Sequence, residues 1–317
     1  MRGMNTTTAP AVANASSRLP PGPRAGWWGF PLLSALRADY LGFTTRLHRE
    51  HGDLTFMQMV NERAYDVFSP ELVREILVDH ADALVRWERG IEVFEQAFGQ
   101  SVLVTEGAVW QRQRRMLHAA FTPRRVAGYA ELMRDAAHGA LDGAVPSGQA
   151  AARVDMEALL TRVAMDVIMR TLFSRPASEE TTAAAHATQV LSASAMREMF
   201  WPVTLPDWLP LPGKAAKRRA LATLRQLVAG HIRDRRAEGD EAPPRADLLG
   251  MLLSLRDEAT GEALTDTEVF DQCMVTFQAG HETTATALLW WSRLLAEHPA
   301  AAERAREEVR TVLAGRE

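Results

Sequence analysis

A long apolar stretch near the end of the sequence constrains the fold more than any other feature. It begins at Thr265, which Glu268 follows three residues later in the pattern of a helix-capping box. It continues without a proline to Glu297 and stops at His298-Pro299. A helix over 265–297 would be roughly 50 Å long at about 1.5 Å per residue. Because helices in globular proteins average ~10–14 residues, we expect this one to cross a whole domain.

The middle of this stretch, 279–284, reads Ala-Gly-His-Glu-Thr-Thr. A glycine costs a helix about 1 kcal/mol relative to alanine, and a carboxylate in apolar surroundings is unfavourable unless it is paired. Residues that oppose their local structure in this way often mark a functional site. Helical spacing places Ala279, Glu282 and Thr283 on one face, where small residues, an acid and a hydroxyl would suit proton delivery beside a planar cofactor. The alternative is a helix whose threonines bond to carbonyls one turn back.

The same segment resembles the start of a zinc-binding His-Glu-x-x-His motif at His281-Glu282. The second histidine would stand at position 285, which is Ala285. We therefore reject zinc chemistry.

A second group lies at Trp110, Arg114 and His118, whose spacing of four residues forms one stripe on a helix. An indole N–H, a guanidinium and an imidazole in line could bind the carboxylates of a ligand, and arginine can do so with two hydrogen bonds. The alternative is a solvated basic face with a tryptophan packed at its edge.

The rest of the sequence predicts a mainly α fold with a small β-sheet (α+β). After a stiff proline-rich segment at 19–23, we expect a helix over 39–51, a β-hairpin with strands at 54–60 and 64–68, and a helix from Ser69 to about Val78. Further helices are expected over 108–120, 123–143, 156–173, 179–199, 214–238, 247–256 and from 299 onward.

Composition limits the classes of function and location. The net charge of −4 argues against nucleic acid as a partner, and the single cysteine, Cys273, suits a reducing compartment. Residues 1–17 lack the apolar core of a secretion signal, and no window approaches the ~20 apolar residues of a membrane span. We therefore expect a disordered tail over 1–17, one domain over 18–317, no membrane anchor and a cytoplasmic location.

Taken together, these motifs resemble the cytochrome P450 family of haem-thiolate monooxygenases, in its soluble bacterial type. Trp110 and Arg114 resemble the family's Trp-x-x-x-Arg motif, and the 279–284 hexapeptide resembles its oxygen-activation motif on a long central helix. His298-Pro299, followed by Glu307-Glu308, resembles the start and body of the next helix. The resemblance extends from about residue 19 to residue 317, in the family's order.

The resemblance implies a cofactor and roles for several residues. The cofactor would be haem b (iron protoporphyrin IX), with Trp110 and Arg114, assisted by His118, on its propionates. Ala279 and Gly280 would lie over its distal face, and Thr283 and Glu282 would be catalytic, the first toward dioxygen and the second in proton relay. The substrate pocket would include the residues Val102, Leu103 and Phe200.

The resemblance also implies a small apolar organic substrate, hydroxylated or epoxidised with dioxygen, and electrons from a ferredoxin or flavodoxin-type donor. The family's glycine-rich cysteine loop and the segment with its Glu-x-x-Arg pair, which follow the helix after the long central one, are not recognised in the sequence, so we expect a chain that ends before both. Cys273 lies on the distal helix and reads as a buried apolar residue. The alternative to an enzyme fragment is a non-catalytic relic that acts at most as a helical haem- or protein-binding module.

Overall fold

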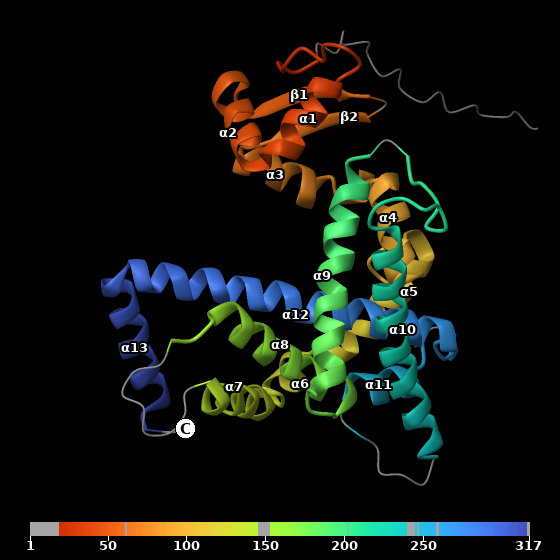
Figure 1. Ribbon diagram of the computed structural model, residues 1–317, viewed down its shortest axis with the longest axis vertical. Helices are drawn as coiled ribbons and strands as arrows, with labels where there is room; N and C mark the ends of the chain where they lie inside the picture. The colour runs from red at the N-terminus through yellow and green to blue at the C-terminus, as the bar shows by residue number, and fades with distance from the viewer. Residues whose placement is uncertain are drawn as a thin grey trace, which may run out of the picture. The chain divides into compact units, whose positions relative to one another are not determined.

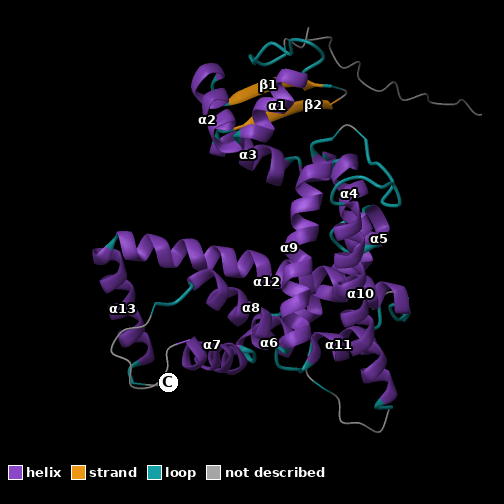
Figure 2. Ribbon diagram, viewed as in Figure 1, coloured by secondary structure: helices purple, strands orange, loops and turns teal. Residues whose placement is uncertain are grey.

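The computed structural model describes residues 19–60, 62–144, 153–201, 203–239, 245, 247–257 and 260–315. It forms two compact units, Met1–Val85 and Arg86–Glu317, each of which is considered by itself. Helices dominate, and the two-stranded sheet belongs to the first unit (Figure 2). The predicted mainly α fold with a small sheet is confirmed. The expected tail over 1–17 lies outside the described residues.

The first unit is built around the β-hairpin. Strands β1 (Leu54–Met59) and β2 (Glu62–Val67) pair in antiparallel register from Leu54 opposite Val67 to Met59 opposite Glu62. The predicted hairpin is confirmed, with its second strand starting two residues earlier. The flanking helices are α1 (Phe30–Ala38), α2 (Tyr40–His51) and α3 (Pro70–Arg74), which continues into one π turn, Glu75–Asp79.

The proline-rich segment ahead of α1 runs along the edge of this hairpin. The carbonyl of Pro21 accepts a hydrogen bond of 3.1 Å from the N–H of Phe56. A Cβ atom on Gly22 would stand only 1.8 Å from the Phe56 carbonyl oxygen. Glycine is therefore required at this position, because any side chain would push the segment off β1.

The second unit is almost entirely helical (Figure 1). Its α-helices in the described residues are α4 (Glu88–Phe98), α5 (Gly107–His118), α6 (Pro123–Ala127), α7 (Ala130–Ala144), α8 (Met156–Phe173), α9 (Glu179–Met199), α10 (Lys214–Ala237), α11 (Leu248–Ser254), α12 (Asp266–Glu297) and α13 (Pro299–Leu313). The bounds of α8 and α9 match the predicted helices. The predicted helix over 123–143 is instead two helices, α6 and α7, separated at Gly128-Tyr129. Neither α1 nor α4 was expected.

Helix α12 is the long helix that the capping box predicts. The Thr265 hydroxyl accepts a hydrogen bond of 3.2 Å from the Glu268 N–H, and the Glu268 carboxylate accepts one of 2.8 Å from the Thr265 N–H. The first half of α12 runs through the core, where Met274 and Phe277 pack with residues of α8, α10 and α11. No helix of the described residues is long and apolar enough to cross a bilayer.

A buried ion pair joins α8, α10 and α11. Arg235 of α10 donates two hydrogen bonds, of 2.9 and 2.6 Å, to Asp247, the N-cap of α11. Ser174, at the end of α8, donates a third hydrogen bond to the same carboxylate, and the Gly250 N–H donates a fourth. Burial opposes ionisation of Asp247, but these hydrogen bonds outweigh it and hold its pKa below the usual value. The carboxylate is therefore ionised at neutral pH.

We predict that Asp247→Ala lowers the free energy of unfolding by about 3 kcal/mol, because the buried guanidinium of Arg235 loses its two short hydrogen bonds to a carboxylate and keeps only the longer, 3.6 Å ion pair with Glu238. Chemical denaturation followed by circular dichroism measures the change.

Because the pKa of Asp247 is lowered in the folded state, the contribution of Asp247 to stability depends on pH. It is complete above the unfolded pKa of about 4 and is lost as the pH falls through the folded pKa. Asp135→Ala, which removes an exposed ion pair with Arg134, is the control. Equal stability of the two variants at pH 7 would contradict the prediction.

Candidate functional site

The Trp110, Arg114 and His118 stripe lies along one side of α5 and opens onto a cavity. All three side chains line this cavity, which has a volume of ≈ 650 Å³ and is closed on another side by residues 255–257. The guanidinium carbon of Arg114 lies 5.4 Å from the centre of the Trp110 ring, within the range of a cation–π contact. The predicted stripe is thus a wall of a real cavity.

The arginines of α5 differ in whether a carboxylate pairs with them. Arg112 pairs with Glu268 at 2.5 Å, and Arg115 pairs with Asp257 at 3.3 Å. Among the described residues, Arg114 has no ion pair with a carboxylate. It is therefore the guanidinium of this helix that is available to an anionic ligand in the cavity.

A second arginine near Trp110 was not anticipated from the sequence. The guanidinium carbon of Arg86 lies 5.7 Å from the Trp110 ring centre, and its Nη2 donates a hydrogen bond of 3.2 Å to the Val102 carbonyl. Arg86 also donates to the Thr105 carbonyl. It fixes the loop that leads into α5, and no sequence spacing links it to that helix.

The hydroxyls of the 279–284 hexapeptide bond to their own helix. Thr283 donates a hydrogen bond of 2.7 Å to the Ala279 carbonyl, and Thr284 donates one of 3.1 Å to the Gly280 carbonyl. Both threonines thus bond to carbonyls one turn back along the helix, as the alternative interpretation of the motif expects. Ala279 and Thr283 are nevertheless exposed side by side on α12, and the hydroxyl oxygen of Thr283 remains able to accept a hydrogen bond.

Gly280 has a different neighbour from the one expected. A Cβ atom there would lie 2.6 Å from Cδ1 of Ile168 on α8. Successive residues of a helix are turned by about 100°, so Gly280 faces α8 while Ala279 does not. The close packing of α12 on α8 thus accounts for the glycine, and its place over the distal face of a cofactor stays a prediction.

Glu282 points toward α9. Its Oε2 accepts a hydrogen bond of 2.6 Å from the hydroxyl of Ser192, in the second half of that helix. Glu282 is half-buried, whereas Thr283 is exposed, so the two predicted catalytic side chains leave α12 in different directions. Ser192 was not found from the sequence, because it stands ninety residues before Glu282 in an alanine-rich helix.

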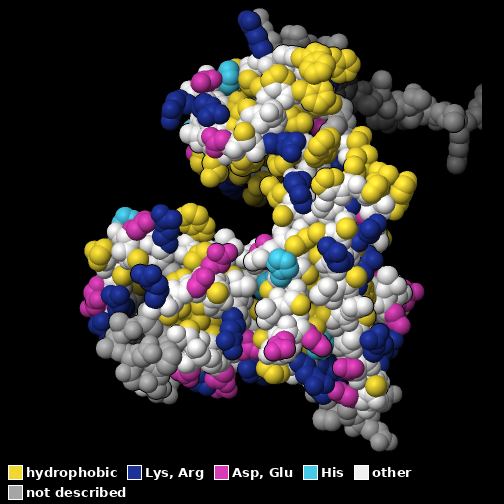
Figure 3. Space-filling model, in the orientation of Figure 1, with side chains coloured by type: hydrophobic (Ala, Val, Ile, Leu, Met, Phe, Trp, Pro, Cys, Tyr) yellow, Lys and Arg dark blue, Asp and Glu magenta, His cyan; other side chains and the backbone are white. Residues whose placement is uncertain are grey.

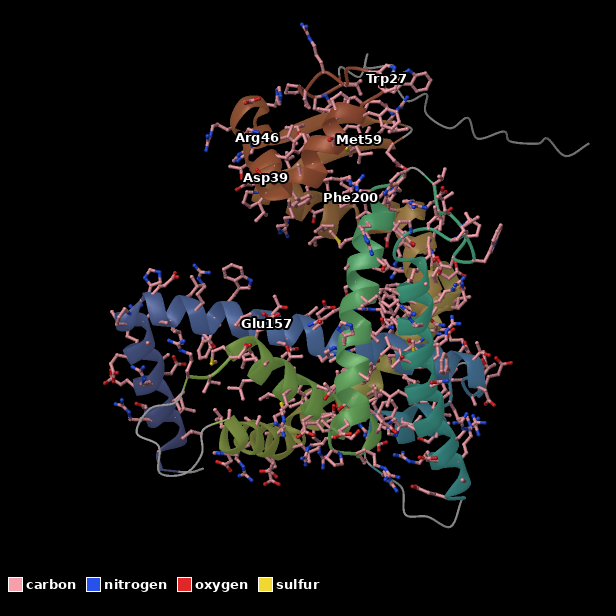
Figure 4. The ribbon with its side chains drawn as sticks, in the orientation of Figure 1. Trp27, Asp39, Arg46, Met59, Glu157 and Phe200 are labelled. Atoms are coloured by element: carbon pink, nitrogen blue, oxygen red, sulfur yellow. The ribbon has the colours of Figure 1, made fainter. Side chains whose placement is uncertain are left out.

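The three residues expected in the substrate pocket lie on two segments. Val102 and Leu103 are in the loop ahead of α5, where the Val102 N–H donates a hydrogen bond of 3.2 Å to Gln272 of α12. Leu103 is 41% exposed. Phe200 directly follows α9 (Figure 4). No contact between Phe200 and the other two is seen in the described residues, so their grouping stays a prediction.

Cys273 is unsuited to bind a metal. Its side chain is fully buried in α12, and burial raises the pKa of the thiol to about 12. A thiol with such a pKa is protonated at neutral pH, whereas metal ligation requires the thiolate. Among the described residues, no cluster of three or more His, Cys, Asp or Glu side chains could hold a metal ion.

Comparison with known proteins identifies the family. The cytochrome P450 family model matches residues 20–317. This chain belongs to the cytochrome P450 family. Retinoic-acid-bound cyanobacterial CYP120A1 has the same fold, with a TM-score of 0.72 and 23% identity over 92% of this chain and 63% of the other.

Three curated relatives of this P450 chain come from Streptomyces. Cyclooctat-9-en-7-ol 5-monooxygenase of Streptomyces melanosporofaciens is 35% identical over 84% of this chain and 56% of its own length. Cyclooctatin synthase of the same organism is 33% identical over 99% of this chain and 66% of its own. Pentalenene oxygenase of Streptomyces avermitilis is 31% identical over 84% of this chain and 57% of its own length. The chain thus spans between about half and two thirds of these relatives.

Haem b is the cofactor of the cytochrome P450 family, and the described residues fit one part of it. Its propionates are carboxylates, which match the unpaired guanidinium of Arg114 beside Trp110 in the α5 cavity. The axial thiolate does not fit Cys273, the one cysteine of the sequence. The 317 residues therefore contain candidates for holding the porphyrin edge and none for the proximal ligand.

We predict that Cys273 resists alkylation by iodoacetamide at pH 8 in the folded protein, because it is buried and its pKa lies far above that pH. Mass spectrometry after timed quenching measures the modified fraction. The same protein in denaturant should react completely within minutes. Rapid modification of the folded protein would contradict the assignment of Cys273 to the core.

We predict that Arg114→Ala weakens the binding of haem to this chain by about 10-fold or more, the cost of losing a charge-assisted hydrogen bond. Titration followed by absorbance gives the dissociation constant. Gln111→Ala, in the same cavity but without a charge, is the matched control. The dimethyl ester of the porphyrin, which lacks carboxylates, should bind both variants equally. An equal loss with the ester would show that Arg114 does not act on the propionates.

Proposed function

We propose that this chain is part of a haem-dependent monooxygenase that inserts one atom of dioxygen into an apolar organic substrate. The observation that carries the proposal is the α5 cavity, where Arg114 is held against Trp110 without a carboxylate partner among the described residues. The hexapeptide on α12, in the same compact unit, supports it. A haem held in this way supplies dioxygen binding and oxidation chemistry once its iron carries a thiolate ligand.

In this proposal, Trp110 and Arg114 bind and orient the cofactor through its propionates, with His118 on the same cavity wall as an assisting donor. The role of Ala279 follows from its small, exposed side chain, which leaves a surface that a flat cofactor can approach. Gly280 contributes indirectly, by letting α12 pack closely on α8.

Thr283 and Glu282 would handle protons at the reacting oxygen. The Thr283 hydroxyl donates to the Ala279 carbonyl, so its free lone pair can accept a hydrogen bond without any rearrangement. Glu282 accepts a hydrogen bond from the Ser192 hydroxyl, and its carboxyl group can take up a proton and pass it on. In this proposal Glu282 acts as the general acid, and Thr283 orients the reacting oxygen by accepting a hydrogen bond from it.

The substrate class proposed is a largely hydrocarbon molecule with few polar groups. The names of two relatives, cyclooctat-9-en-7-ol 5-monooxygenase and pentalenene oxygenase, specify an alkenol and an alkene. The apolar side chains of Val102, Leu103 and Phe200 are the proposed contacts. Electrons would come from a ferredoxin or flavodoxin-type protein, and the proposed location is the cytoplasm.

A non-catalytic role is the second candidate, favoured by one observation. The sole cysteine is buried and protonated, so these residues alone would bind haem without a thiolate bond. The spectrum of the reduced, carbon monoxide-treated chain tests whether a thiolate bond is absent. A thiolate-type Soret band in the 317-residue chain would contradict our assignment of Cys273.

We predict that Thr283→Ala lowers the product formed per dioxygen consumed by about tenfold or more, because proton delivery by a placed group contributes ~10²–10⁴ in rate. The measurement requires the protein joined to a segment that supplies the axial cysteine, with oxygen uptake and product followed together. Thr284→Ala, which removes a back-bonded hydroxyl from the adjacent position, is the control. Unchanged coupling in Thr283→Ala would remove this residue from the proposed role.

A further inference from the structure

The loop between α4 and α5, residues 99–106, carries Val102 and Leu103, two of the proposed substrate contacts. Gly99 ends α4 with a φ of 55°, in the left-handed region that favours glycine. The loop belongs neither to a helix nor to a strand. Its place therefore depends on the hydrogen bonds that it makes with the helices around it.

Helix α12 binds the backbone of this loop. The Gln100 N–H donates a hydrogen bond of 2.8 Å to the Asp271 carboxylate, and the Val102 N–H donates one of 3.2 Å to the side-chain carbonyl of Gln272. Both donors are main-chain groups, so these bonds fix the path of the loop itself. Two consecutive residues of α12 thus hold alternate N–H groups of the loop.

Helix α5 holds the same loop through Gln113, which is 1% exposed. Its Nε2 donates a hydrogen bond of 2.9 Å to the Gln100 carbonyl, and its Oε1 accepts one of 2.8 Å from the Thr105 hydroxyl. Gln100 is therefore bound on both sides, by its N–H toward α12 and by its carbonyl toward α5. The loop joins the two helices that carry the motifs of the candidate site.

Asp271 is the unusual member of this set. It is 7% exposed, and it has no ion pair in the part of the chain that the structure describes. Burial raises the pKa of its carboxyl group, and the negative charges of Glu268 on α12 and Glu95 on α4 add to the rise. The Gln100 hydrogen bond and the positive charge of Arg225 on α10 oppose the rise only in part.

The fit between Asp271 and the loop is close. A Cβ atom on Gly99 would stand 2.2 Å from the Asp271 Oδ1, so the carboxylate rests directly on the loop backbone. An apolar side chain of similar size would fill this place without the cost of burying a carboxylate. The hydrogen bond to Gln100 is what the acid adds, and a residue that is unfavourable in its surroundings often has a functional role.

We propose that Asp271 is a positioning residue, whose carboxylate holds the 99–106 loop against α12 and thereby sets where Val102 and Leu103 lie. A hydrogen bond to an ionised acceptor is stronger than one to a neutral acceptor, so the loop is held most firmly while Asp271 is ionised. The position of the loop is a property of this chain. Its consequence for the choice of substrate rests on the proposed monooxygenase function.

The test is hydrogen–deuterium exchange at single amides of the 317-residue chain, with each rate divided by that of an unfolded peptide to give a protection factor. At pH 7 we expect Asp271→Ala to lower protection of the Gln100 amide about tenfold or more, and Asp271→Asn, which keeps an acceptor oxygen without the charge, about fivefold. The Val102 amide keeps its own partner, Gln272, so it reports the position of the loop. We expect its protection to fall about threefold or more in Asp271→Ala.

Glu95→Ala is the matched control. The Glu95 carboxylate accepts a hydrogen bond from the side chain of the same residue, Gln100, but does not bind the loop backbone there. We expect it to leave both amides protected as in the wild type. Unchanged protection of Gln100 in Asp271→Ala would overturn the proposal. A fall at Gln100 with none at Val102 would also overturn it, because the contact would then be purely local.

The dependence of protection on pH separates positioning by the ionised acid from a general packing role. Because the pKa of Asp271 is raised, we expect the Gln100 amide of the wild type to lose about fivefold in protection as the pH falls through that pKa. Asp271→Asn should show no such step. The amide of Val228, which is fully buried in α10, shows that the protein is still folded at each pH. A wild type without the step, or the same step in Asp271→Asn, would overturn the proposal.

A spin label reports the place of the loop directly. Cys273 is buried, so Leu103→Cys provides one accessible thiol for a nitroxide. We expect Asp271→Ala in this background to make the label more mobile by electron paramagnetic resonance, and Glu95→Ala to leave it unchanged. Equal mobility in the two variants would contradict the positioning role. If Asp271→Ala fails to fold, shown by circular dichroism, Asp271→Asn takes its place.

The outcome of these experiments is independent of the proposed monooxygenase chemistry. The exchange and mobility measurements use neither haem nor substrate. Asp271 can therefore be shown to position the loop even where Thr283→Ala leaves coupling unchanged, and the reverse also holds. The two proposals fail separately.

Discussion

The close packing of α12 on α8 is the contact on which the second unit depends. It is set by Gly280, where any Cβ atom would collide with Ile168. Once that side of α12 is fixed, the helical rotation of about 100° per residue determines where each neighbour points. His281 is buried, Glu282 borders the cavity with α9, and Ala279 and Thr283 remain exposed. One glycine thus orients the acid and the hydroxyl of the motif.

Much of the fold was predictable because its signals are local. The capping box at Thr265 and the stop at His298-Pro299 fix α12 to within a residue, and strand patterns fix the hairpin. The sequence did not predict helices or helix breaks that have no local signal. Helix α4 begins after Trp87 without a side-chain cap, and the break between α6 and α7 falls at Gly128-Tyr129 inside a continuous helical pattern.

The candidate site was predictable to the extent that it lies on single helices. Spacing alone aligned Trp110, Arg114 and His118, and they share one cavity. Arg86 and Ser192 could not be found in this way, because only the tertiary fold brings them beside Trp110 and Glu282. Among the residues that the structure describes, Arg114 has no carboxylate partner because those of its neighbours, Glu268 and Asp257, lie far along the chain and pair with Arg112 and Arg115 instead. Over the second unit, acidic and basic side chains are interspersed (Figure 3), so pairing decides which charges remain available.

The different directions of Glu282 and Thr283 give the two residues different surroundings, and so different tasks in the proposed function. The cavity that Glu282 borders lies on the side of α12 toward α8 and α9, whereas the exposed side carries Ala279 and Thr283. Glu282 is placed between the two sides, and its link to α9 is a single hydrogen bond from Ser192. A hydrogen bond to a charged group is worth about 1.5–3 kcal/mol, so Ser192 fixes the direction in which the Glu282 carboxylate leaves α12.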